Sequence, residues 1–97
     1  MPDEGSGGGN KFASDDLLDS HYQKHGQEFG DITKNAYLKQ ADNLVNSNGS
    51  NVVTKTRSNG DILYYNKATN EFAVKASNGS IRTYFKPTGG LDYFNRQ

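Results

Sequence analysis

Residues 58–85 read SNGDILYYNKATNEFAVKASNGSIRTYF, and this stretch decides the fold. Apolar and polar residues alternate along it, which is typical of β-strands with one buried face. The two Asn-Gly pairs, at 59–60 and 78–79, are the strongest two-residue hairpin signals, and residues 67–70 (KATN) suit a four-residue turn between them. The sequence therefore predicts an antiparallel meander of four strands, at residues 52–58, 61–66, 71–77 and 80–86.

Tight turns fix the register of such a meander, so the two faces of the predicted sheet can be written down. Two-residue turns place Ser58 opposite Asp61 and Lys75 opposite Arg82. One face is then almost continuously apolar, and we expect the helices to pack on it: Leu63, Tyr65, Phe72, Val74, Ala76, Ile81, Thr83 and Phe85. The other face combines cations with tyrosines, and we expect it to be exposed: Lys55, Arg57, Ile62, Tyr64, Glu71, Ala73, Lys75, Arg82, Tyr84 and Lys86.

Two helices are predicted before the strands, because apolar residues recur there at helical spacing. Ser14 is a suitable N-cap for the first helix, and Gly26 can take the left-handed conformation that ends it. Thr33 is a suitable N-cap for the second, which the polar run 46–51 ends. The predicted fold class is α+β: two N-terminal helices packed on one face of a four-stranded antiparallel β-meander, followed by a short helix or extra strand from Leu91.

The composition limits the class of protein. The chain has 97 residues, of which 32% are hydrophobic, which is enough for one small domain only. We expect residues 1–11 to be a flexible Gly-rich linker or a leader left by cloning, and residues 12–97 to form the domain. The absence of cysteine excludes disulfides, thiolate metal sites and a cysteine nucleophile. No apolar run is long enough for a membrane helix, so we expect no membrane insertion by this domain.

The cations of the predicted exposed face suggest a surface for phosphate groups. Lys75 and Arg82 would form a like-charge pair that needs an anion or a carboxylate between them, so we expect them to clamp a phosphate. Tyr64 and Tyr84 would leave a shallow place between two rings where a base could stack. The bland alternative is a solvated sheet surface with tyrosine rings under lysine stems. The other residues of the expected RNA-binding set are Lys55, Arg57 and Lys86.

The two histidines, His21 and His25, share one face of the first predicted helix. Both could ligate one metal ion, but the Glu that follows the first His in zinc helices is missing, and we expect no metal. One could instead cap the helix while the other packs. In the third interpretation, His25 is a general acid, because the helix C-terminus and the nearby Glu28 favour the imidazolium form. His21 is then expected to be partly packed beside Tyr22.

Four blocks of the sequence resemble a known family. They are HYQKHGQEFG (21–30), ITKNAYLKQADNL (32–44), SNGDILYYNKATNEFAV (58–74) and NGSIRTYFKP (78–87). They are similar to the small C-terminal toxin domains of bacterial polymorphic and contact-dependent inhibition systems, and to domains of some phage head proteins. These toxin domains are assigned to the barnase, EndoU, colicin and RelE-like ribonuclease superfamily. The resemblance implies N-terminal helices on an antiparallel sheet of four or more strands, in agreement with the pattern above.

The resemblance also implies a function. Such domains are metal-independent endoribonucleases, often directed at transfer RNA, that need no cofactor. They belong to secreted or cell-surface effectors and act in the cytoplasm of a competing bacterium, while an immunity protein protects the producing cell. RNA carries its own nucleophile, so the protein must take the 2′-hydroxyl proton, protonate the leaving 5′-oxygen and stabilise the phosphate charge. The residues expected to be catalytic are His25, His21, Arg82, Lys75, Thr83 and Tyr84.

Three further expectations complete this interpretation. Thr83 is included only because its strand carries a block of the resemblance, since the predicted register turns it to the core. The free domain is expected to be a monomer. The immunity protein is expected to present an acidic surface to Lys55, Arg57, Lys75, Arg82 and Lys86. The alternative function is a noncatalytic module that binds RNA or a protein through the same basic, tyrosine-bearing face.

Overall fold

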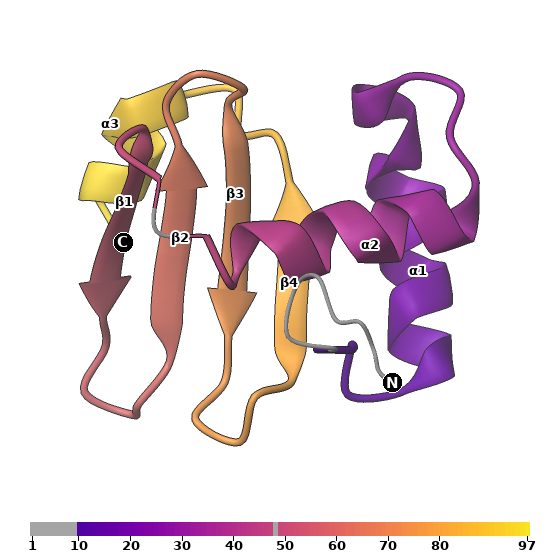
Figure 1. Cartoon of the computed structure of the whole chain (residues 1–97), viewed down its shortest axis with the longest axis horizontal. Helices are drawn as coiled ribbons and strands as arrows, with labels where there is room; N and C mark the ends of the chain where they lie inside the picture. Colours follow the sequence, from indigo (N-terminus) through magenta and orange to yellow (C-terminus); the bar gives the residue numbers. More distant parts are fainter. Residues whose placement is uncertain (1–9, 48) are drawn as a thin grey trace.

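The computed structural model describes residues 10–47 and 49–97, and these form an α+β domain. The sheet has the strand order β1-β2-β3-β4, with all neighbours antiparallel. Figure 1 shows α2 crossing one face of the sheet near β3 and β4, with α1 beside β4 and α3 near β1 and β2. The elements are α1 (Asp15–His25), the 3₁₀ turn η1 (Gly26–Phe29), α2 (Lys34–Leu44), β1 (Val52–Thr56), β2 (Ile62–Asn66), β3 (Glu71–Lys75), β4 (Ile81–Phe85) and α3 (Gly90–Asn95).

The two N-terminal helices begin where the sequence predicts. The hydroxyls of Ser14 and Thr33 each accept a backbone N–H of the first helical turn at 3.1 Å. The prediction for Gly26 is wrong: it has φ −55° and continues into η1, and the positive φ is found instead at Gly30, with 87°. Gly26 is needed for space, because a Cβ there would lie 3.0 Å from the ring of Tyr22.

The first hairpin differs from its predicted register by one residue. Arg57 N–H donates to the Asp61 carbonyl at 2.8 Å, so the loop is residues 58–60 and Thr56 pairs with Ile62. Gly60, at φ 94°, occupies the left-handed position that follows a type I turn in three-residue hairpin loops. The Asn-Gly pair therefore marks the turn correctly, although it does not make the two-residue loop.

The second Asn-Gly hairpin makes the same kind of loop, and a bulge then restores the predicted register. Ala76 N–H donates to the Ser80 carbonyl at 2.7 Å. Lys75 pairs with Ile81 instead of Arg82, and the register shifts between Val74 and Lys75. Beyond the bulge, the pairs toward the other end of β3 and β4 are as predicted. The register predicted between β2 and β3 is confirmed throughout.

The helices α1 and α2 cover the opposite sheet face from the one predicted. Their cluster includes the buried sheet residues Tyr64, Ala73, Ile81 and Tyr84. The predicted apolar face is instead covered by the short α3, where Phe94 packs with Leu63, Tyr65, Phe72 and Val74. Residues 63–65 and 72–74 are consequently buried on both faces of the sheet. The domain therefore has three layers: α1 and α2, the sheet, and α3. Because α1 and α2 cover the predicted basic face, that face is not an exposed surface.

The folded unit begins slightly before the predicted boundary. Asn10 N–H donates to Asp42 Oδ1 at 2.8 Å, and Ile81 N–H donates to the Lys11 carbonyl at 2.8 Å. Residues 10 and 11 thus belong to the folded unit, beside the start of β4. The rest of the predicted linker, residues 1–9, lies outside the described residues. Among the helices that the structure describes, none has the length and apolar character to cross a membrane.

Candidate functional site

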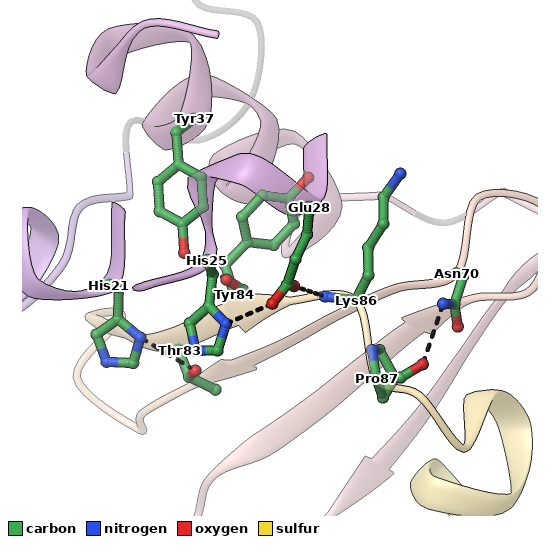
Figure 2. Close-up of polar contacts among 9 residues, drawn as sticks. All are labelled: His21, His25, Glu28, Tyr37, Asn70, Thr83, Tyr84, Lys86 and Pro87. Carbon is green, nitrogen blue, oxygen red and sulfur yellow. Dashed lines mark hydrogen bonds and ion pairs between the residues drawn. The ribbon is translucent and has the colours of Figure 1, made fainter. Parts of the chain in front are cut away.

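The two histidines lie together at the β4 edge of the sheet (Figure 2). The ring centroids of His21 and His25 are 5.9 Å apart. Thr83 Oγ1 lies 3.4 Å from His21 Nδ1, and the Phe85 ring stacks on His25 with 5.1 Å between centroids. The two imidazoles of α1 therefore contact β4 side chains that lie on the sheet face opposite to α2.

His25 is held by a carboxylate that is itself held by the backbone. His25 Nδ1 and Glu28 Oε2 are 2.8 Å apart, and the side chains are 15% and 33% exposed. Glu28 Oε1 accepts the backbone N–H of Lys86 at 2.8 Å, so the carboxylate connects the helix end to the end of β4. With Nδ1 donating to Glu28, the other ring nitrogen of His25, Nε2, is left for a ligand. The sequence-based expectation that Glu28 lies near His25 is confirmed.

His21 has different surroundings. Its ring lies 5.5 Å from that of Phe12, and Thr83 supplies a hydroxyl near Nδ1. Burial, followed by the charges of His25 and Lys24, lowers the pKa of His21 below its ordinary value of 6.5. His21 is therefore neutral at neutral pH and can accept a proton, whereas the Nδ1 atom of His25 is bound to the Glu28 carboxylate. Two titratable groups in such unequal surroundings can divide the roles of base and acid.

This pKa shift predicts a pH dependence of stability. Because the folded protein holds the pKa of His21 below 6.5, the unfolded chain binds the proton first as the pH falls. The contribution to stability is present above the unfolded-state pKa and is lost as the pH falls from that value through the lower pKa of the folded state. We expect the free energy of unfolding to fall less in a His21→Gln variant than in the original protein between about pH 7 and pH 5. Urea unfolding measures this, and parallel pH profiles would contradict it.

The tyrosines predicted to be functional are core residues. Tyr84 is fully buried (0% exposed) and Tyr64 is 8% exposed, so neither ring can stack a base. The Tyr84 ring stacks on Phe29 with 4.6 Å between centroids, and its hydroxyl donates to Glu71. Burial raises the pKa of the Tyr84 hydroxyl above its ordinary value. The predictions of a catalytic Tyr84 and of a base-stacking Tyr64 are therefore wrong.

The predicted phosphate clamp is not assembled either. The bulge in β4 places Lys75 opposite Ile81, and Arg82 turns instead to Asp61, with 3.0 Å between Arg82 Nε and the carboxylate. Asp61 is buried, so it holds this guanidinium at the sheet surface. Lys75 Nζ donates to the Val45 carbonyl at 3.3 Å. Both cations have an internal partner, and the two are not cross-strand neighbours.

The remaining predicted RNA-binding cations also serve the fold. Lys55 Nζ donates to three carbonyls at the chain end, of which Phe94 is the nearest at 3.0 Å, and so caps α3. Arg57 donates to the Gln97 side chain at 3.3 Å. Lys86 Nζ lies 5.1 Å from the centroid of the Phe29 ring, within the helix-covered layer. The predicted basic face is thus divided between two sides of the sheet.

No protein-family model and no curated protein matches this chain. The case for a function therefore rests on the residues at the β4 edge. In the described part of the chain, no group of three His, Cys, Asp or Glu side chains is placed to hold a metal ion. What the edge does hold is one neutral imidazole beside a hydroxyl and one imidazole paired with a carboxylate.

The structure brings together only part of the predicted catalytic set. His21, His25 and Thr83 meet at the β4 edge, while Tyr84 and the two predicted clamp cations do not. Sequence analysis missed the place of Phe85 beside His25 and turned Thr83 into the core. The position of β4 could have indicated this: β4 is the last strand of the meander, so no further strand of the sheet separates its outer edge from a helix.

Proposed function

We propose that this domain is a metal-independent endoribonuclease that cuts RNA, with transfer RNA as the substrate that the family resemblance favours. The observation that carries the proposal is the pair of imidazoles at the β4 edge. Their ring centroids are 5.9 Å apart, one lies beside a hydroxyl and the other is bound to a carboxylate. Cleavage of RNA needs one group that accepts the 2′-hydroxyl proton and a second group that donates a proton to the leaving 5′-oxygen. Two imidazoles in different surroundings suit these two roles.

In the proposed reaction, His21 Nε2 takes the proton from the ribose 2′-hydroxyl. Its Nδ1–H then donates to Thr83 Oγ1, which keeps the ring oriented. The 2′-oxygen attacks phosphorus, the P–O5′ bond breaks, and His25 Nε2–H protonates the leaving 5′-oxygen. Glu28 keeps Nδ1 of His25 protonated throughout. The products are a 2′,3′-cyclic phosphate and a 5′-hydroxyl, so atoms and protons balance without a further reactant.

The proposed biological setting is competition between bacteria. A domain of this kind is delivered as part of a secreted or cell-surface effector and acts in the cytoplasm of the target cell. An immunity protein in the producing cell would have to cover the His21–His25 edge to block the reaction. Because Lys55 and Arg57 lie at α3 whereas Lys75 and Lys86 lie by the helix layer, these cations do not offer one continuous surface to an acidic partner.

Incubation of the purified domain with total RNA in excess EDTA tests the proposed activity. We expect discrete cleavage that persists with the chelator, because the reaction needs only protein groups and the 2′-hydroxyl. An oligonucleotide with 2′-deoxyribose at the cleaved position should stay intact, and the new 3′ ends should be cyclic phosphates. The control is a double variant, His21→Ala with His25→Ala. Retention of RNA without cleavage would overturn the proposal in favour of a noncatalytic binding module.

A further inference from the structure

The cations predicted to bind phosphate have partners within the protein. Another cation near the histidines is therefore needed to bind a phosphate group, and Lys24 is a candidate. Lys24 lies on α1 between the two imidazoles in sequence, three residues after His21 and one before His25. Residues three and four apart on a helix share a face, so Lys24 and His25 both neighbour His21. The charge of Lys24 is one of those that act on His21.

Lys24 lacks the partner that its helix position would ordinarily give it. Glu28, four residues later, is the natural carboxylate for an i, i+4 pair with Lys24. Both Glu28 oxygens are engaged elsewhere, one with His25 Nδ1 and one with the Lys86 backbone N–H. Within residues 10–47 and 49–97, the structure gives exposed Lys24 no hydrogen bond, ion pair or ring contact.

We propose that Lys24 and the outer ring nitrogens of His21 and His25 form a phosphodiester-binding site on α1, with a single-stranded RNA backbone as its ligand. This inference rests on the proposed function and names its phosphate contact. A phosphate oxyanion at this place would compensate the charge of the Lys24 ammonium and accept a hydrogen bond from His25 Nε2–H. The neutral His21 would then lie beside the sugar whose 2′-hydroxyl it deprotonates. Lys24 thus takes the place of Lys75 and Arg82, for which the sequence pattern predicts this contact.

A binding experiment separates this site from the chemistry. The probe is a fluorescent single-stranded RNA of mixed sequence in which every 2′-hydroxyl is methylated, so that it cannot be cleaved. We expect Lys24→Gln to weaken binding about 5-fold to 10-fold and to reduce the slope of log K against log salt by about 0.7, the value for one lost phosphate contact. Lys24→Arg should restore both quantities. Lys39→Gln is the matched control, because Lys39 is an exposed lysine on α2.

The outcomes distinguish failure of this inference from failure of the proposed function. If the original protein binds the probe and cleaves natural RNA, but Lys24→Gln binds like Lys39→Gln, the inference about Lys24 is overturned alone. If the original protein binds the probe through Lys24 but cleaves no RNA, the phosphate site stands and the ribonuclease proposal fails. If the original protein does not bind the probe, the site is overturned. The pKa of His21, measured by NMR titration, should be higher in Lys24→Gln than in the original protein, because a positive charge is removed. An unchanged pKa would contradict the proximity of Lys24 and His21.

Discussion

Replacement of His25 by alanine is expected to slow RNA cleavage by about 10²-fold or more. In the proposed reaction, the variant has no group to protonate the leaving 5′-oxygen, and Glu28 loses its ring partner. His21→Ala should have an effect of similar size, because it removes the base. Initial rates on a labelled RNA of defined sequence measure both effects, and they are to be compared at equal concentrations of folded protein.

The control for this pair of variants is Gln27→Ala, because Gln27 is exposed, directly precedes Glu28 and lies two residues after His25. Its rate and its melting temperature should stay close to those of the original protein. Full activity in both histidine variants would end the acid–base proposal. If activity falls only in variants whose melting temperature also falls, the histidines have a purely structural role.

Tyr84→Ala is expected to cost about 3–5 kcal/mol of folding free energy, the range for removing a large buried aromatic ring. The ring of Tyr84 is fully buried, stacks on Phe29 and packs against Tyr37, so its removal leaves a cavity between the helices and the sheet. Urea unfolding followed by circular dichroism measures the change. In a domain of this size, such a loss can prevent folding at ordinary temperature, so a milder variant is needed.

Tyr84→Phe supplies that milder variant. It keeps the ring and removes only the hydroxyl that donates to Glu71, so we expect a loss of about 1 kcal/mol. RNA cleavage by folded Tyr84→Phe should match that of the original protein, because this hydroxyl lies in the helix-covered layer. A large drop in its rate without a drop in stability would restore Tyr84 to the catalytic set and contradict a purely structural role for its hydroxyl.

Local signals in the sequence were sufficient for much of the fold. The N-caps Ser14 and Thr33 begin the helices as predicted, because a capping hydroxyl acts within three residues of the chain. The β2–β3 register is also confirmed, since the turn at residues 67–70 has one favoured length and Asn70 takes the left-handed conformation, with φ 62°. The α3 segment is a helix, one of the two predicted alternatives.

The errors come from interactions that no local pattern contains. An Asn-Gly pair fits both a two-residue and a three-residue hairpin loop, and the choice of the longer loop moved the register of β1 by one residue. Tyrosine suits either a surface or a core, so alternation could not show that Tyr64 and Tyr84 form the platform for the helices. The coverage of the other sheet face depends on the six residues of α3, which are far away in sequence.

The sequence predicts that the two histidines of the candidate site lie together, but not which strand they contact. The i, i+4 spacing of His21 and His25 places them on one helix face wherever that helix packs. Which strand they meet depends on where α1 docks, and α1 docks against the edge strand β4 instead of the middle of the sheet. Thr83 therefore contacts His21, although its strand register alone turns it to the side that α3 covers.

The close approach of Gly26 and Tyr22 bears on how an inactive form of the domain can be made. Gly26 follows His25 directly and is the first residue of η1, the turn that carries Glu28, and a side chain at this position would meet the Tyr22 ring. Tyr22 cannot move aside freely, because its hydroxyl donates to the Ile32 carbonyl at 2.5 Å. A substitution at Gly26 would thus disturb the proposed catalytic site and the packing together. For an inert antigen or a decoy that keeps the native surface, a change confined to an imidazole is the better choice.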